Sequence, residues 1–297
     1  MSLIVQEIDE ILQPENIELT TFEKMNPTLN MLGMFEKKNN EGRDSFAFAR
    51  NESNAEQQIV NGILHEPVEI MEAAQLPQVK ITGISRNIGK MRRIGFEAEF
   101  TEEALRDPIN ADKIQLTTDM MGYAMARTLN RHAYVVLTQA AEAPTITLGG
   151  GSWATEGNEY IDDDVKHLIR AFENQEGYDY KLTDMFTSKA SYWGAEDYYE
   201  VVNDDGFNPA NVRGATLKGI GELESGLLGI DMNLKPAKWY YNVYPTDNLL
   251  HDDFGTFIHI NRVDKLDEIP RSVKIQMYVE YGFAVLEPKA VVFQEGI

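Results

Sequence analysis

The segment NADKIQLTTDMMGYAMARTLNRHAYVVLTQAA, residues 110–141, contains no proline and has a helical pattern. Its periodic face comprises residues three, four or seven positions apart: Ile114, Met121, Met125, Leu129, His132 and Val136. Asn110 offers an N-cap, and Pro144 ends the pattern. At about 1.5 Å per residue such a helix is about 45 Å long, whereas the mean helix has about 11–12 residues. We therefore expect one long helix that forms the spine of the fold.

Strand-like sequence precedes this helix. Apolar residues between 79 and 96 are interrupted by Gly83, Gly89 and Gly95, which is typical of broken, twisted strands. The stretch FEAEF at 96–100 alternates apolar residues with glutamates and predicts a half-buried strand. Thr101 is placed to cap a short helix that ends before Pro108.

Residues 1–78 are predicted to be extended segments rather than a domain. Ile4, Ile8 and Ile11 predict a short amphipathic helix, which packs either on its own chain or on a neighbouring copy. Mixed, proline-interrupted sequence follows up to residue 40. Between 41 and 78, the alternation of Phe46 and Phe48 leads into a polar run. This part is expected to form a long hairpin or loop of the kind that binds a partner.

Two further helices and several short strands are expected after a Gly-rich break at 145–157. Asp162, Asp163 and Asp164 begin a helix with apolar residues at 165, 168, 169 and 172, and Gly177 is expected to end it. Residues 182–187 predict a strand, and Ser188 can cap the helix that follows. A turn-rich stretch at 203–214 precedes strands expected at 220–232, 239–244, 256–260, 273–279, 283–286 and 291–293. The class is therefore α+β.

Composition excludes several kinds of protein. The chain has 297 residues and a net charge of −21, from 27 basic and 48 acidic side chains. Because nonspecific binding to a phosphate backbone uses clustered Lys and Arg, a nucleic-acid reader is disfavoured. The absence of cysteine excludes disulfides, thiolate metal sites and cysteine nucleophiles. We find neither a membrane span nor a signal peptide by pattern.

The sequence contains partial matches to catalytic motifs but no complete one. Residues 221–226 have the glycine spacing of a phosphate-binding loop, but Leu227 and Leu228 replace the required Lys and Ser or Thr. Asp247 and the His251-Asp252-Asp253 run could form an oxygen-rich metal site, although a solvated turn is the favoured interpretation. His132 is interpreted as a packed or hydrogen-bonded side chain. We predict no catalytic residue, no metal site and no cofactor.

Charged and aromatic residues near the strands are candidates for contacts between subunits. Arg92 and Arg93 lie close in sequence to Glu97 and Glu99. The simpler interpretation is ordinary surface charge, and the alternative is complementary pairing across a subunit contact. Phe46 and Phe48, in the expected hairpin, complete this set of candidate inter-subunit contacts.

The order of these elements resembles that of one family. The chain runs from LPQVK at 76–80 to FEAEF at 96–100, and then through TEEALRD at 101–107 into the long helix, with LNR at 129–131. It continues through TDMFTSKASYW at 183–193 and ends with YGFAVLEPKAVVF at 281–293. In this order and spacing it resembles the major capsid proteins of tailed bacteriophages and related viruses, which have the HK97 fold.

The resemblance implies an HK97-like α+β capsid fold. It assigns residues 1–40 to an N-arm, 41–95 to an extended E-loop, 96–144 to a P domain with the spine helix, 145–250 to an A domain, and 251–297 to C-terminal strands that return to the P domain. It implies a non-enzymatic structural protein that self-assembles into hexamers and pentamers of an icosahedral virion capsid in the host cytoplasm.

The implied partners are copies of the chain itself and packaged double-stranded DNA, bound without sequence specificity. Scaffolding, portal and cement proteins are further candidate partners, and no membrane is implied. Two alternatives remain open. One is an encapsulin, a compartment shell of the same fold that encloses a cargo enzyme. The other is a metal-dependent enzyme that uses the cluster between Asp247 and Asp253.

Overall fold

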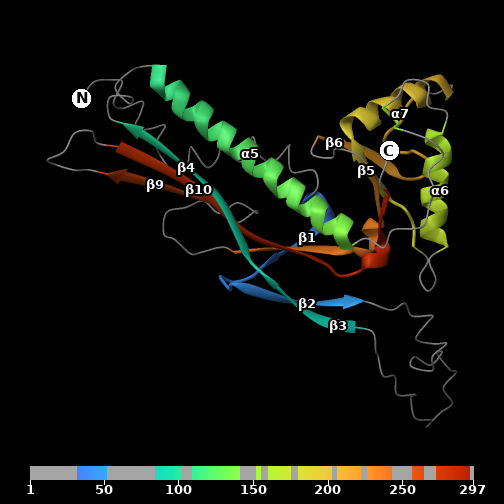
Figure 1. Ribbon diagram of the computed structural model, residues 1–297, viewed down its shortest axis with the longest axis horizontal. Helices are drawn as coiled ribbons and strands as arrows, with labels where there is room; N and C mark the ends of the chain where they lie inside the picture. Colours follow the sequence, from blue (N-terminus) through green and yellow to red (C-terminus); the bar gives the residue numbers. More distant parts are fainter. Residues whose placement is uncertain are drawn as a thin grey trace, which may run out of the picture. The chain divides into compact units, whose positions relative to one another are not determined.

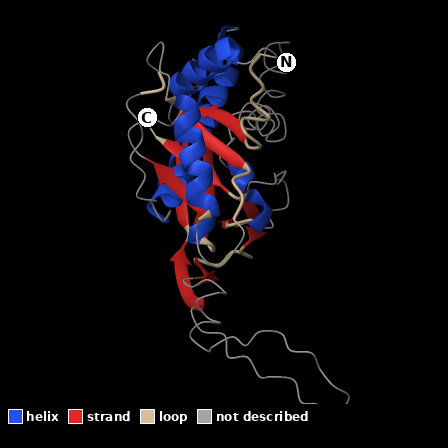
Figure 2. Cartoon of the chain, turned by 90° about the vertical axis from the view of Figure 1, so that its right-hand side faces the viewer, coloured by secondary structure: helices blue, strands red, loops and turns tan. Residues whose placement is uncertain are grey.

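The computed structural model describes residues 32–51, 84–101, 109–140, 152–154, 160–174, 180–202, 206–221, 226–242, 256–263 and 272–294 (Figure 1). The chain divides into two compact units. Unit 1 comprises residues 1–46, 89–133 and 239–283, and unit 2 comprises residues 47–88, 134–238 and 284–297. Both helices and strands contribute to the described chain, which confirms the expected α+β class (Figure 2).

A five-stranded sheet is built mainly from residues of unit 1. Its strands pair in the order β1-β8-β10-β4, and β9 also pairs with β10. The bounds are β1 (Phe35–Asn39), β4 (Arg92–Thr101), β8 (Ala237–Tyr241), β9 (Thr256–Val263) and β10 (Ser272–Val285), with a 3-10 turn η2 (Leu32–Met34) before β1. A separate two-stranded sheet joins β2 (Ser45–Asn51) to β3 (Ile84–Lys90).

The antiparallel register of β4 and β10 gives this pair one apolar and one polar face. Ile94 lies opposite Val279, and Ala98 lies opposite Ile275. Directly opposite residues share a face, and the β10 members of these pairs are fully buried. The alternate positions carry the charges, since Arg93 lies opposite Glu280.

The predicted long helix is α5 (Ile109–Ala140), drawn in green in Figure 1. Four residues of the predicted periodic face, Ile114, Met121, Met125 and Leu129, are buried as expected. Beyond them the buried row continues through Ala133 and Leu137, whereas His132 and Val136 are partly exposed. The predicted N-cap is wrong by two residues, because the helix begins at Ile109 and Asn110 lies in its first turn.

Unit 2 contains a four-stranded sheet in the order β11-β7-β5-β6. Strand β5 pairs parallel with β6 and antiparallel with β7. Helix α7 connects the two parallel strands, which require such a crossover. The bounds are α6 (Ile161–Glu173), β5 (Asp184–Ser188), α7 (Lys189–Val202), β6 (Thr216–Ile220), β7 (Leu227–Ile230), η3 (Met232–Leu234), η4 (Pro288–Ala290) and β11 (Val291–Gln294).

Helices α6 and α7 pack into one hydrophobic core of unit 2. Val165, Leu168 and Phe172 of α6 are buried, as their spacing predicts. Leu168 and Phe172 pack against Gly229 of β7, where an added Cβ would come within about 3 Å of both side chains. Helix α6 ends at Glu173, before the predicted Gly177, with Asn174 as its C-cap.

The start of α7 matches the prediction. Ser188 Oγ accepts a hydrogen bond from the backbone N–H of Ser191 at 3.1 Å, as an N-cap does.

Some predicted strand boundaries are wrong. The expected strands at 273–279 and 283–286 are one strand, β10, which continues through Gly282. A Cβ at Gly282 would come within 2.2 Å of the ring of Phe46, so this glycine is a close-packing position rather than a break. Within 220–232, where one strand was expected, Ile220 ends β6 and residues 227–230 form β7. Strand β8 begins before the predicted residue 239.

Several expectations lie outside the described residues. They are the helix within 1–12, the short helix after Thr101, most of the Gly-rich break at 145–157, and the cluster between Asp247 and Asp253. Among the helices of the described ranges, none is long and apolar enough to span a membrane.

Candidate functional site

The candidate contact residue Arg93 is held against a buried carboxylate of its own chain. Its Nε donates to Glu280 Oε1 at 2.7 Å, and a second guanidinium nitrogen contacts the same oxygen. The guanidinium also lies over the ring of Tyr278, 4.8 Å from its centroid. The Glu280 side chain is 9% exposed, but that of Arg93 is 60% exposed. Arg93 therefore neutralises a buried charge while it presents a polar surface to solvent.

Asn242 extends this ion pair into a buried polar network. Its Nδ2 donates to Glu280 Oε2 at 2.9 Å and to the carbonyl of Arg43 at 3.2 Å. Its Oδ1 accepts from the backbone N–H of Gly42 at 3.1 Å. Asn40 Nδ2 donates to the same Arg43 carbonyl at 2.7 Å. The network thus fixes the turn that leads into β2 to the strands β8 and β10.

That turn needs an unusual backbone conformation. Glu41 has φ 56° and Gly42 has φ 73°, both in the left-handed region. Two consecutive left-handed residues, one of them glycine, are typical of a tight reversal between strands.

Glu97 and Glu99 share one cation on the polar face of the β4–β10 pair. Lys274 Nζ lies 3.2 Å from Glu97 Oε1 and 3.5 Å from Glu99 Oε2. Hydrogen bonds from Gln276 and then from Lys274 lower the pKa of Glu97, and the Glu97 carboxylate raises the pKa of Lys274. The side chains of Glu97, Glu99 and Lys274 are 45%, 50% and 32% exposed, so the cluster is a solvated charged strip.

Phe46 lies in the core of unit 1 rather than on a free surface. Its ring stacks on Tyr240 at a centroid distance of 4.1 Å and packs over Gly89 and Gly282. Phe48, on the same side of the same strand, is half-buried. The described contacts of Phe46 are thus within its own chain, and a role of either ring in a subunit contact stays a prediction.

Arg92 is exposed and lies opposite Tyr281 in the β4–β10 register. The buried Tyr281 hydroxyl is hydrogen bonded to Nδ1 of His132 on α5. Burial, and then the positive charges of Arg92 and Arg131, lower the pKa of His132. This confirms the expectation that His132 is a packed, hydrogen-bonded side chain.

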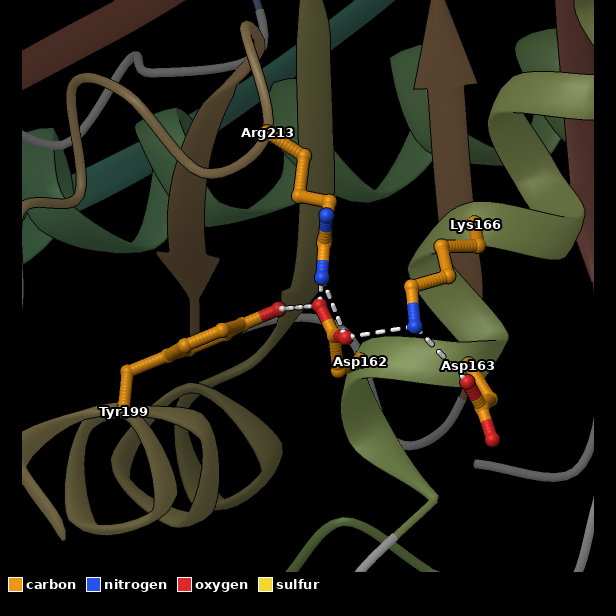
Figure 3. Close-up of polar contacts among 5 residues, drawn as sticks. All are labelled: Asp162, Asp163, Lys166, Tyr199 and Arg213. Carbon is orange, nitrogen blue, oxygen red and sulfur yellow. Dashed lines mark hydrogen bonds and ion pairs between the residues drawn. The ribbon is translucent and has the colours of Figure 1, made fainter. Parts of the chain in front are cut away.

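The three aspartates at the start of α6 each have a different environment. Asp162 accepts both Nε and a terminal nitrogen of Arg213 at 2.5 Å, and it also binds Lys166 at 2.8 Å and the Tyr199 hydroxyl at 3.3 Å (Figure 3). Hydrogen bonds from Arg213 lower the pKa of Asp162 to about 2 despite an opposing effect of burial. Burial and the adjacent Asp162 charge raise the pKa of Tyr199.

The other two aspartates are also accounted for by protein contacts. Asp163 pairs with Lys166 at 3.0 Å, and the buried Asp164 accepts the indole N–H of Trp153 at 2.9 Å. Across the ranges that the structure describes, no group of His, Asp or Glu residues has the arrangement of a metal site. The interpretation of these aspartates as a helix start is therefore confirmed by their position in the first turn of α6.

Comparison with known proteins identifies the family. The model of the family described as phage capsid protein matches residues 88–293, which is more than half of the chain. The chain belongs to the phage capsid protein family. A search of curated proteins finds no match for this capsid protein.

Solved structures share its fold at low sequence identity. The capsid of the cyanophage P-SCSP1u matches with a TM-score of 0.59 at 11% identity, covering 89% of this chain and 86% of that one. A virus-like particle from Pyrococcus furiosus matches with a TM-score of 0.57 at 10% identity, covering 95% and 98%. The capsid of a native GTA particle matches with a TM-score of 0.57 at 12% identity, covering 91% and 90%. The capsid protein therefore has the expected HK97-like α+β fold.

Two components of the capsid protein's polar network were not predicted as site residues. Asn242 and Glu280 are distant in sequence from Arg93 and carry no motif. The sequence could have indicated a role for Glu280, because this acid interrupts the apolar run from Tyr278 to Val285 at a point where the strand becomes buried on both faces. A buried carboxylate requires a partner.

Proposed function

We propose that this phage capsid protein is the major building block of an icosahedral head, in which it forms hexamers and pentamers around double-stranded DNA. The family match over residues 88–293 carries the proposal. Assembly in the host cytoplasm, and scaffolding, portal and cement proteins as partners, belong to the same proposal. So does the division into an N-arm (1–40), an E-loop (41–95), a P domain (96–144), an A domain (145–250) and returning strands (251–297).

The charge of the chain supports a shell around DNA rather than a DNA reader. At a net charge of −21, a copy gains little from nonspecific contact with phosphates. A wall that attracts the genome weakly lets the DNA move during packing and ejection. A strongly basic surface facing the interior of an assembled particle would count against this part of the proposal.

The candidate contact residues fit a repeated interface of charged strips. Glu97 and Glu99 are 45% and 50% exposed in the single chain, Lys274 is 32% exposed, and Arg93 is more than half exposed. Such a surface can pair with a neighbouring copy without the desolvation of an isolated charge. The inter-subunit role of Phe46, Phe48, Arg92, Arg93, Glu97 and Glu99 is part of this proposal.

Expression of the chain, followed by size analysis and negative-stain electron microscopy, tests the proposal. Closed shells, or rings of five and six copies, are the expected products. Nuclease-protected double-stranded DNA within shells produced during infection would support a viral head. Shells that enclose a protein cargo instead would favour the encapsulin alternative, and a monomer at high concentration, with or without a scaffold protein, would refute both.

A further inference from the structure

The outer face of α7 carries large apolar side chains that the chain leaves exposed. Trp193 is 60% exposed and Val201, two turns later, is 86% exposed. Asp197 and Glu200 lie on the same exposed side of the helix. We call these four residues the α7 face. An exposed tryptophan and an exposed valine on one helix face, with two acids between them, are typical of a protein contact surface rather than of a solvated helix.

Packing of the opposite side holds this face in a fixed orientation. Ala195 and Tyr199 are buried in the core of unit 2. At Gly194 a Cβ would come within 1.7 Å of the carbonyl oxygen of Trp153, so the two backbones are in close contact. Tyr192 packs over Gly219 of β6. Because its opposite side is packed, helix α7 cannot rotate to bury the α7 face against its own chain.

A second exposed surface of unit 2 has the opposite charge. Leu234, 44% exposed, lies beside Lys235, and Lys181 is held close to them. Asp231 makes this connection, because its Oδ2 accepts the N–H of Lys181 at 2.9 Å and its Oδ1 accepts the N–H of Asn233 at 3.1 Å. We call Lys181, Leu234 and Lys235 the lysine rim.

Lys235 occupies this position at a conformational cost. Its φ is 46°, in the left-handed region that glycine adopts without steric penalty. The residue closes η3 with a hydrogen bond from its N–H to the carbonyl of Met232 at 3.2 Å, a contact that glycine could make equally well. The lysine side chain is thus not needed for the turn, and it is exposed on the surface of unit 2.

Net charge limits how copies of this chain can meet. With 48 acidic and 27 basic side chains, most pairs of surfaces on two copies repel each other. A surface on which Asp197 and Glu200 lie between Trp193 and Val201 is favourably matched by a surface that combines Leu234 with Lys181 and Lys235. Both kinds of surface occur on unit 2, each exposed and each different from the other. Two different complementary surfaces on one chain produce head-to-tail contacts, which close into rings when the rotation permits.

We propose that the α7 face of one copy binds the lysine rim of the next copy around a ring. Trp193 and Val201 pack against Leu234 of the neighbour, while Asp197 and Glu200 pair with its lysines. This contact rests on the proposed function, and it specifies which surfaces of unit 2 hold a capsomer together.

Substitutions at Lys235 and Asp197 test the contact in the full-length chain. Lys235→Gly removes the ammonium group and relieves the left-handed backbone, so the fold is retained while the subunit concentration needed for assembly rises about tenfold. Lys235→Glu has a larger effect, because it places a third acid at the contact. Combining Lys235→Glu with Asp197→Lys restores assembly. Arg170→Glu, a charge reversal on the exposed side of α6, is the matched control and assembles as the wild type does.

Cross-linking provides a direct measure of proximity, since the wild-type chain has no cysteine. Oxidation of the Val201→Cys, Leu234→Cys double variant gives a ladder of covalent oligomers, from dimer upward, on a denaturing gel. Each single-cysteine variant gives no covalent product larger than a dimer. The contact is refuted, and the proposed function is not, if the wild type assembles, both Lys235 variants assemble at the wild-type concentration, and no ladder forms. A wild-type chain that never assembles refutes the proposed function and this contact with it.

Discussion

Replacement of Asp162 by Asn tests how strongly the ion cluster of unit 2 stabilises it. Asp162 receives two hydrogen bonds from Arg213, which lies in a turn between α7 and β6, and one from Lys166 of its own helix. It therefore joins the start of α6 to that turn (Figure 3). Asparagine has nearly the same shape and keeps one acceptor oxygen, so the substitution removes the charge with little change in packing.

The pKa of Asp162 sets the magnitude of the effect. A decrease from the ordinary value of 3.8 to about 2 corresponds to about 2 kcal/mol, at about 1.4 kcal/mol per pH unit. The side chains of Arg213 and Lys166 are 45% and 36% exposed, and solvent screening reduces this contribution to about 1 kcal/mol. Because the folded-state pKa lies below the unfolded value, the contribution is complete above about pH 4 and is lost as the pH falls toward about 2.

Denaturant unfolding of unassembled subunits, followed by tryptophan fluorescence, measures this effect. Trp153 is a suitable reporter, because it is buried and hydrogen bonded to Asp164 in the first turn of α6. We expect Asp162→Asn to lower the free energy of unfolding by about 1 kcal/mol at about pH 6, and the gap to the wild type to narrow between about pH 4 and pH 2. Asp163→Asn, which removes only the Lys166 contact, is the control with a smaller effect. A gap that stays constant or widens as the pH falls would refute the assignment of the stabilisation to the Asp162 charge.

Three further substitutions test the packing and the buried network by the same unfolding measurement. Asn242→Ala removes the buried hydrogen bonds of Asn242 with the Gly42 N–H and with Glu280 Oε2, so we expect a loss of about 3 kcal/mol, and a loss below about 1 kcal/mol would contradict the network. Gly194→Ala should destabilise despite the better helix propensity of alanine, because its Cβ would meet the Trp153 carbonyl, and a stabilised variant would show that α7 can shift freely. Phe172→Ala empties a fully buried position of the unit 2 core and should cost about 3–5 kcal/mol; an unchanged midpoint would contradict the described packing of α6.

Local patterns were sufficient to predict α5, α6 and the start of α7. The buried row of α5 and that of α6 follow spacings that can be read directly from the sequence, and the Ser188 cap depends on a side chain three residues from its partner. The boundaries were less predictable. The gap predicted between the strands at 273–279 and 283–286 includes Gly282, but close packing of the Phe46 ring is what requires a glycine there.

The polar network was not predictable, because its partners are brought together only by the fold. Arg93 and Glu280 are 187 residues apart, and Gly42 and Asn242 are 200 residues apart. Arg93 could be recognised as a candidate from its neighbouring charges, yet its described partner lies on β10 rather than on β4. The charge of Glu97 was likewise visible in the sequence, but Lys274 became its partner only through the strand register. Long-range pairing of this kind depends on which strands become neighbours, and single-sequence patterns do not specify that.

Cryo-electron microscopy of particles formed by the full chain tests the central claim most directly. We predict closed shells in which the sheet β1-β8-β10-β4 with α5, and the sheet β11-β7-β5-β6 with α6 and α7, repeat in rings of five and six copies. Particles in which these units form only filaments or small closed oligomers, under conditions that include a scaffold protein, would contradict it.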